Sequence, residues 1–231
     1  HFSRGNAIVR KLHPFDLDAA RAEIETLKRE ASAPTDFPPL LPPTGPIFIV
    51  GLPRSGKSTL EGMLARHPSL FPAGELPAAG VMSRYLETAE FGDRYRAMAT
   101  ALAPGQRIVD TMPNNFKLLG LMRAALPEAR VLYCAREPEG HALALFRKYF
   151  NRAGNEYTGD LDDARAYVDL YSDLMTFWSD RFPGFLRRVD TSTISAAPAP
   201  EMRQLLDFLG AGWEVACAEP YISEPRLPAA R

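Results

Sequence analysis

The sequence has few of the residues and runs that are typical of disulfide, metal or membrane proteins. Only two cysteines, Cys134 and Cys217, occur in 231 residues, and they lie far apart and outside any C-x-x-C pair. The four histidines show no H-x-x-x-H or H-E-x-x-H spacing, so the sequence predicts no transition-metal site. No apolar run approaches the ~18–20 residues that span a bilayer. We therefore expect a cytoplasmic protein with two buried free thiols and no membrane span.

An excess of charge of one sign is also missing. Lysine and arginine together number 27 and aspartate and glutamate 28, which leaves a net charge of −1. Proteins that bind nucleic acid carry a basic excess or a basic patch, so this balance predicts no nucleic-acid partner. Any anion site must therefore be built locally by a few residues. A hydrophobic fraction of 46% and a charged fraction of 24% fit one well-packed domain with at most a small appendage.

Proline marks a boundary near residue 46. Residues 17–30 carry apolar side chains at helical spacing, and six prolines then occur in the fourteen residues from Ala33 to Pro46. A segment so rich in proline is too stiff for a random coil and unsuited to a sheet. The sequence therefore predicts a helical segment and proline-rich linker over residues 1–45 and the main domain over residues 46–231.

Short apolar strands alternate with amphipathic helices in the main domain. The sequence predicts strands over residues 46–51, 108–110, 130–135 and 185–189, and helices after the first strand and over residues 116–126, 141–150, 161–181 and 202–209. This alternation predicts an α/β fold in three layers, with helices on both faces of a mostly parallel sheet.

A glycine-containing loop follows the first of these strands. Residues 51–58, GLPRSGKS, satisfy G-x-x-x-x-G-K-[ST] at every specified position. Gly56 lets the backbone approach an anion, and the following helix adds the partial positive charge of its first turn. Charged and hydroxyl side chains surround this point: Arg54, Lys57, Ser58 and Thr59. The sequence therefore predicts a P-loop-like anion site.

An anion loop alone does not distinguish phosphoryl from sulfuryl transfer. A P-loop kinase or NTPase also needs an acidic residue at the end of another strand to hold Mg²⁺. Asp110, at the end of a short predicted strand, is the one fair candidate. A P-loop enzyme that uses ATP and Mg²⁺ therefore stays open as an alternative.

Six segments of the chain match one family pattern in the same order. They are residues 46–61 (PIFIVGLPRSGKSTLE), 66–76 (RHPSLFPAGEL), 110–116 (DTMPNNF), 131–138 (VLYCAREP), 154–161 (GNEYTGDL) and 206–213 (LDFLGAGW). Together they resemble bacterial sulfotransferase domains of the type that follows tetratricopeptide repeats, which are related to tyrosylprotein sulfotransferases. The resemblance covers nearly the whole chain, and no single motif carries it. It implies a P-loop-like α/β fold, with residues 1–45 as the tail of an upstream repeat region.

The resemblance also implies an activity and a donor. A sulfuryl group would pass from 3′-phosphoadenosine 5′-phosphosulfate (PAPS) to a hydroxyl acceptor, namely a tyrosine, a sugar or a small phenol or alcohol, and adenosine 3′,5′-bisphosphate would remain. Glu75 aligns with the general base that takes the proton of the acceptor hydroxyl. Arg136 aligns with the arginine that grips the 3′-phosphate. The residues that would hold the 5′-phosphosulfate are Arg54, Ser55, Gly56, Lys57, Ser58 and Thr59. Arg54 and Lys57 would also act in catalysis, because charge builds on the oxygen that bridges sulfur and phosphorus.

The chain departs from the family pattern at three places. Lys57 and Ser58 stand where the family has two threonines, Thr111 stands where it has a lysine, and Ala144 stands where a serine contacts the 3′-phosphate. We expect Lys57 to take over the electrostatic role of the lysine missing at Thr111. A catalytically weakened nucleotide-binding module is therefore a further alternative.

Overall fold

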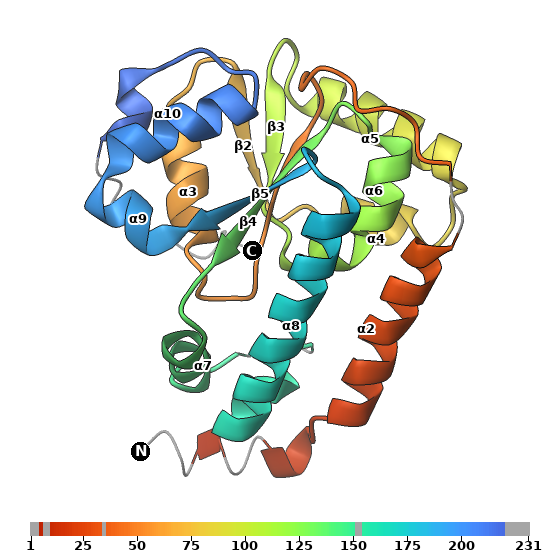
Figure 1. The fold of residues 1–231 in the computed structure, drawn as a ribbon, viewed down its shortest axis with the longest axis vertical. Helices are drawn as coiled ribbons and strands as arrows, with labels where there is room; N and C mark the ends of the chain where they lie inside the picture. The colour runs from red at the N-terminus through yellow and green to blue at the C-terminus, as the bar shows by residue number, and fades with distance from the viewer. Residues whose placement is uncertain (1–4, 7–9, 34–35, 151–153, 220–231) are drawn as a thin grey trace, which may run out of the picture.

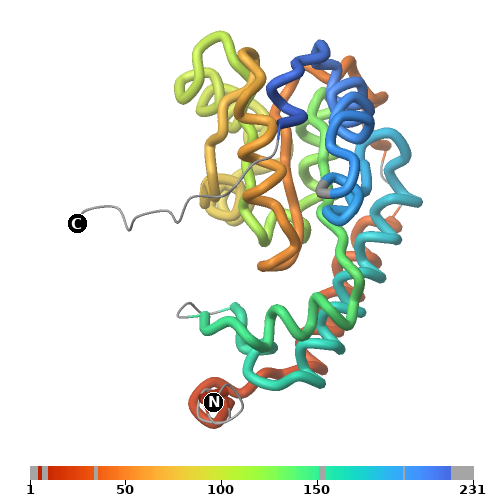
Figure 2. Tube along the Cα trace, turned by 90° about the vertical axis from the view of Figure 1, so that its left-hand side faces the viewer, coloured from red at the N-terminus to blue at the C-terminus, as the bar shows by residue number. Residues whose placement is uncertain are grey.

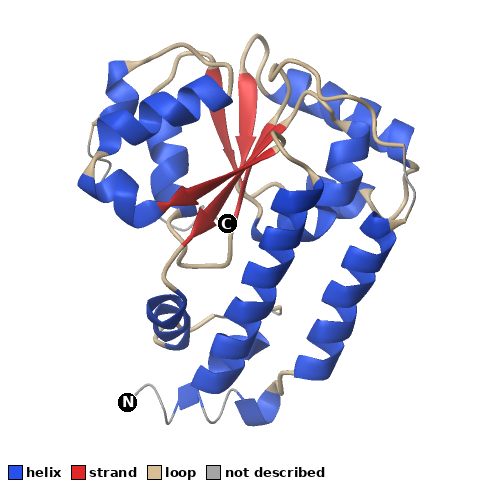
Figure 3. Ribbon diagram, viewed as in Figure 1, coloured by secondary structure: helices blue, strands red, loops and turns tan. Residues whose placement is uncertain are grey.

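The computed structural model describes residues 5–6, 10–33, 36–150 and 154–219. At its centre is a sheet of five strands in which every neighbouring pair is parallel (Figure 3). The strands are β1 (Ile47–Val50), β2 (Leu70–Gly74), β3 (Arg107–Asp110), β4 (Arg130–Ala135) and β5 (Leu186–Asp190). Their spatial order is β2-β3-β1-β4-β5, which places β1 at the centre. The predicted parallel α/β fold is confirmed.

Helices cover both faces of the sheet because its strands are apolar on both sides. In β1, Phe48 and Val50 pack into the core on one face, and Ile47 and Ile49 pack into a second core on the other face. The helices of the first face are α4 (Ala78–Met82), α5 (Thr88–Leu102), α6 (Leu119–Ala125) and α8 (Leu161–Arg181), and those of the second face are α3 (Lys57–Leu64), α9 (Thr191–Ala196) and α10 (Pro198–Phe208) (Figure 1). Short 3-10 turns, η1 (Pro113–Leu118), η2 (Glu156–Gly159) and η3 (Val215–Ala218), complete the connections.

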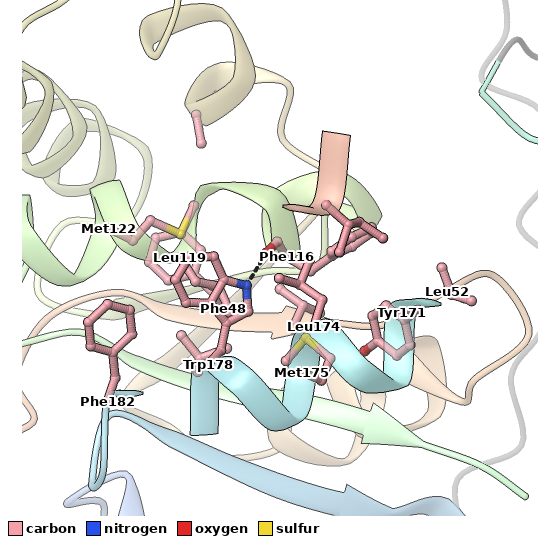
Figure 4. Packing of buried hydrophobic residues seen from close by; sticks show 14 of the residues in the cluster. Phe48, Leu52, Phe116, Leu119, Met122, Tyr171, Leu174, Met175, Trp178 and Phe182 are labelled. Carbon is pink, nitrogen blue, oxygen red and sulfur yellow. Dashed lines mark hydrogen bonds between the residues drawn. The ribbon is translucent and has the colours of Figure 1, made fainter. Parts of the chain in front are cut away.

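The long helix α8 organises the larger core. Its residue Trp178 is buried and stacks on Phe182, with ring centroids 5.5 Å apart and an interplanar angle of 11°. The indole Nε1–H donates to the carbonyl oxygen of Phe116 at 3.1 Å (Figure 4). A buried indole needs such an acceptor, and this bond fixes α8 against the turn η1.

Helix α2 (Leu17–Ser32) begins at Asp16, whose carboxylate accepts from the amide of Ala19. Figure 2 shows α2 and α8 running alongside each other away from the sheet. Ala20 and Ile24 of α2 are buried in the same core as Trp178. The predicted N-terminal helix is confirmed, while the domain boundary at residue 46 stays a prediction.

The proline-rich segment runs past the amino ends of the strands and is held there by arginines. Three of its carbonyl oxygens accept from guanidinium groups: Pro38 from Arg123 at 2.6 Å, Leu41 from Arg130 at 2.8 Å, and Gly45 from Arg107 at 2.8 Å. Burial lowers the pKa of all three arginines, to about 10 at Arg107, and the neighbouring Arg130 adds to the effect at Arg107. Guanidinium groups that are partly removed from solvent therefore hold the proline-rich segment in place.

Several elements differ from the sequence prediction. The sequence predicts no strand at residues 70–74, yet β2 forms there at the edge of the sheet, where Pro72 is tolerated. The helix predicted over residues 141–150 is α7 (Pro138–Phe146), which begins and ends earlier. Glu137 caps it by accepting from the amides of residues 139 and 140, and Pro138 suits the first helical position.

Candidate active site

The predicted site residues lie at the carboxyl ends of three strands. The glycine loop, residues 51–56, follows β1, Glu75 follows β2 and Arg136 follows β4. Strand β4 is a direct neighbour of β1, and β3 lies between β1 and β2. Ligands of open parallel sheets bind outside this edge. The sheet thus gathers residues from three separate parts of the chain.

The backbone of the glycine loop enters the left-handed region twice. Arg54 has φ 66° and Gly56 has φ 94°. A Cβ on Gly56 would lie 2.6 Å from Cγ2 of Thr191, so this position needs glycine both for its conformation and for its space. Left-handed conformations of other residues cost energy and cluster at functional sites. Arg54 occupies such a position with its side chain exposed.

Lys57 bends back over its own loop. Its Nζ donates to the carbonyl oxygens of Gly51 at 2.7 Å and Leu52 at 3.1 Å, and the side chain is buried. Burial lowers the pKa of the Lys57 ammonium, and negative charge at Glu75 acts in the opposite direction. Lys57 and Glu75 are therefore within electrostatic reach of each other, although they follow different strands.

Two further side chains hold the loop from outside. His141 of α7, which is 2% exposed, donates from Nε2 to the carbonyl oxygen of Pro53 at 2.8 Å. A carbonyl oxygen can only accept, so Nε2 carries the proton. Burial lowers the pKa of His141, and the charge of Arg136 adds to this effect. Arg136 in turn donates from Nη1 to the carbonyl oxygen of Arg54 at 3.2 Å. With its carbonyl groups turned to these donors, the loop leaves amide groups for an anion.

Ser55 contributes a buried hydroxyl that lacks a partner. The residue is 1% exposed, and its Oγ makes no hydrogen bond to the part of the chain that the structure describes. A Cβ on Gly51 would lie 2.5 Å from this oxygen, so any larger residue at position 51 would collide with the Ser55 hydroxyl. An unsatisfied buried hydroxyl is costly, and an oxygen of a bound phosphate or sulfate would satisfy it. Ser58 and Thr59 add hydroxyl groups from the first turn of α3, exposed and half-buried respectively.

Glu75 is exposed and follows Gly74 at the end of β2. The amide of Gly74 donates to Oε1 of Glu61 at 2.8 Å, and its carbonyl oxygen accepts from the amide of Thr111 at 2.9 Å. The main chain that carries Glu75 is therefore held by α3 and by β3. Neither Glu61 nor His141 is predicted from the sequence as a site residue. A signal for Glu61 exists, because it is a charged residue on the buried face of a helix.

The carboxylate of Asp110, at the end of β3, accepts four hydrogen bonds from the protein itself. Its Oδ1 accepts from the amides of Met112 at 2.9 Å and Leu76 at 3.4 Å, and its Oδ2 accepts from Tyr95 Oη at 2.8 Å and Asn115 Nδ2 at 3.1 Å. Burial raises the pKa of this carboxyl group, and the four hydrogen bonds oppose the rise. A carboxylate has about four acceptor positions, so Asp110 has none left for a metal ion.

Other features lie away from these residues. A cavity of about 540 Å³ is lined by none of the predicted site residues, but by Arg10, Lys11, Phe146, Gly159, Asp160, Leu161, Asp162 and Arg165.

Cys134 and Cys217 are free and buried, as expected, and burial raises the pKa of Cys134 to about 12. Over the described ranges, no three His, Cys, Asp or Glu side chains gather as metal ligands. The same part of the chain contains no helix long and apolar enough to cross a membrane.

Known structures share this fold. A sulfotransferase domain from the olefin synthase of Synechococcus PCC 7002 is 18% identical, with a TM-score of 0.62 and 82% of each chain covered. A sulfotransferase domain from the curacin biosynthetic pathway is 20% identical, with a TM-score of 0.58 and 80% of each chain covered. A sulfotransferase from Alicyclobacillus acidocaldarius is 18% identical, with a TM-score of 0.52, 73% of this chain covered and 81% of the other. At these identities the similarity shows the fold.

Sequence comparison shows the family. An uncharacterized protein of Aquifex aeolicus (strain VF5) is 28% identical over an alignment of 208 residues, and the match covers 78% of this chain and 27% of that protein. The chain thus spans about a quarter of the length of this relative. The model of the sulfotransferase family matches residues 46–103 and 82–215, which is more than half of the chain and includes all five strands. The chain belongs to the sulfotransferase family.

Proposed function

We propose that the protein transfers the sulfuryl group of PAPS to a hydroxyl group of its acceptor, with Glu75 as general base. The observation that carries the proposal is the glycine loop of a sulfotransferase-family chain. Its carbonyl groups are held by Lys57, His141 and Arg136, and the buried hydroxyl of Ser55 still lacks a partner. These features suit an anion with several oxygen atoms.

The donor would be bound by residues at the ends of β1 and β4. The loop and the first turn of α3 hold the 5′-phosphosulfate through Arg54, Ser55, Gly56, Lys57, Ser58 and Thr59. Arg136 holds the 3′-phosphate, because its exposed guanidinium lies beside the loop and a guanidinium can bind a phosphate through two parallel hydrogen bonds. PAPS supplies the activated sulfuryl group.

In the proposed reaction, the acceptor oxygen attacks sulfur while its proton passes to the carboxylate of Glu75. The bond between sulfur and the bridging oxygen breaks, and the electron pair stays on the phosphate of adenosine 3′,5′-bisphosphate. Negative charge therefore builds on the bridging oxygen, where Lys57 and Arg54 stabilise it. A tyrosine of a peptide, a sugar hydroxyl and a small phenol or alcohol all meet these requirements.

A P-loop kinase or NTPase is not favoured. That class needs a carboxylate that holds Mg²⁺, and Asp110 already accepts four hydrogen bonds from the protein. We therefore expect adenosine 3′,5′-bisphosphate to bind in the presence of a metal chelator, as measured by calorimetry. ATP with Mg²⁺ is the comparison ligand, and binding of that ligand alone would overturn the proposal.

The position of the 3′-phosphate can be tested in the same measurement. We expect Arg136→Ala to weaken binding of adenosine 3′,5′-bisphosphate by roughly 10-fold or more, since a hydrogen bond to a charged group contributes about 1.5–3 kcal/mol. Adenosine 5′-phosphate lacks the 3′-phosphate, so its affinity should change much less. Equal losses for both ligands would show that Arg136 acts only by holding the loop.

The role of Glu75 has its own test. Glu75→Gln keeps the shape of the side chain but removes its basicity, so we expect turnover of PAPS to fall about 10²–10⁴-fold. Affinity for adenosine 3′,5′-bisphosphate should stay the same. Formation of this product is measured with 4-nitrophenol, a tyrosine peptide and a sugar as acceptors. Glu87→Gln, at an exposed position nearby in the sequence, is the control. An unchanged rate in Glu75→Gln would remove Glu75 from the mechanism.

A further inference from the structure

We propose that Glu61 is a positioning residue that fixes Glu75 relative to the glycine loop. The inference rests on the proposed function, because it assigns Glu61 a task only if Glu75 is the base. Glu61 belongs to α3, the helix that begins with Lys57, and it is 3% exposed. Its contact with this part of the site is the hydrogen bond from the main chain of Gly74.

The end of β2 is irregular just before Glu75. The pairing of β2 with β3 shifts register between Pro72 and Gly74, and Gly74 has φ 69°. At this point the amide of Gly74 donates to Oε1 of Glu61 at 2.8 Å, across 13 residues of sequence. Bulges of this kind occur next to active sites, where they re-aim a side chain. Here the next side chain is that of Glu75.

The hydrogen bond to the amide of Gly74 is made by a buried carboxylate. Removing a charge from water costs far more than burying a neutral acceptor. What the carboxylate adds is a charge-assisted hydrogen bond between α3 and the end of β2, shorter and stronger than a neutral bond. Glu61 thus ties the segment that carries the base to the helix that carries the loop.

The spacing on α3 makes this tie useful. Lys57 and Glu61 are four residues apart and both are buried, so they lie on the same face of one helix. A single helical turn therefore sets the distance between Lys57, in the proposed PAPS site, and Glu61, which holds the main chain before Glu75. On its other side, Glu75 is followed by Leu76, whose amide donates to Asp110 Oδ1 at 3.4 Å. Two buried carboxylates thus hold the amides on either side of the base.

Two substitutions of Glu61 separate its positioning role from the effect of its side-chain volume. Glu61→Leu has a similar volume but no acceptor, and we expect it to lower turnover about 10–100-fold, since a 1 Å misplacement can cost 10²-fold. Glu61→Gln keeps an oxygen that accepts from the amide of Gly74 in a neutral hydrogen bond, so it should lose less turnover than Glu61→Leu. Glu128→Leu is the matched control, because Glu128 is a half-buried carboxylate that pairs with Arg96 near the amino end of β4. It should lose stability without losing turnover per folded molecule.

A double-mutant cycle with Glu75→Gln decides the inference. If Glu61 acts through Glu75, Glu61→Leu should have little further effect in the Glu75→Gln background. Equal losses in both backgrounds would overturn the inference while leaving Glu75 as the base. A Glu75→Gln variant with full turnover would instead overturn the proposed function. Independently of activity, hydrogen exchange of the Gly74 amide should become faster in Glu61→Leu, and unchanged exchange would also overturn the inference.

Discussion

At the scale of single residues, Lys57 and Thr111 come after two strands that are neighbours in the sheet. Strand β3 pairs directly with β1; Thr111 follows β3 and is buried, and Lys57 begins α3 after the loop that follows β1. The sulfotransferase pattern has a lysine at position 111, and this chain has its cation at position 57 instead. An ammonium group has three donors, and the carbonyl oxygens of Gly51 and Leu52 take two. In the proposed function, the third N–H of Lys57 donates to an oxygen of PAPS.

Exchanging these residues tests whether Lys57 has taken over the role. We expect Lys57→Thr to lower turnover by roughly 10–100-fold, because a charge-assisted contact contributes about 1.5–3 kcal/mol. The double variant Lys57→Thr with Thr111→Lys should recover turnover, and Thr111→Lys alone is the control. Steady-state formation of adenosine 3′,5′-bisphosphate is the measurement. A silent Lys57→Thr would contradict the exchange and favour a weakened nucleotide-binding module.

The site could be predicted from sequence only as far as its motifs reach. Arg54, Glu75 and Arg136 stand out because each follows a short apolar run or lies in a recognisable pattern. His141 and Glu61 do not, since each acts on a backbone group of a segment far from it in the sequence. Such contacts depend on which strands become neighbours. That order is not encoded in local periodicity.

At the scale of elements, the turn from β1 into α3 depends on Gly56. We expect Gly56→Ala to lower the free energy of unfolding by about 1–3 kcal/mol, because the new Cβ meets Thr191 and the backbone conformation disfavours other residues. Affinity for adenosine 3′,5′-bisphosphate should fall as well, since the amide groups would move. Chemical denaturation and calorimetry measure the two effects.

Gly80→Ala is the matched control for Gly56→Ala. Gly80 lies inside α4, and a Cβ there would meet nothing within 4 Å. Alanine favours a helix by about 0.5–1 kcal/mol over glycine, so this variant should be neutral or slightly more stable. Equal losses in Gly56→Ala and Gly80→Ala would show that the loop has no special demand for glycine.

Most elements follow from sequence because their patterns are strong, and the exceptions have physical reasons. The period of α8 gives its bounds of residues 161–181 directly. Strand β2 contains a proline, which an edge position tolerates, and edge positions are a property of the assembled sheet. Helix α5 buries only Phe91, Gly92 and Tyr95 among fifteen residues, so its apolar stripe is too thin to detect.

At the scale of the molecule, the N-terminal helix is part of the packed structure. Ile24 of α2 is buried against the core that contains α8. We expect Ile24→Ala to lower the free energy of unfolding by about 2–5 kcal/mol in a single transition. Leu12→Ala, at a position that is 69% exposed, should change it by less than about 0.5 kcal/mol. A separate early transition in Ile24→Ala would instead favour residues 1–45 as an independent segment.

The strand order also has a consequence for how the chain is made. Strand β1 is apolar at every position and fully buried, yet its two neighbours begin only at residues 107 and 130. Contacts of such long sequence separation form slowly, and an unpaired hydrophobic strand is prone to aggregate. During synthesis, β1 therefore stays unpaired until β3 and β4 have been made. The loop, Glu75 and Arg136 follow three different strands, so the site can be assembled only after β4 and Arg136 have left the ribosome.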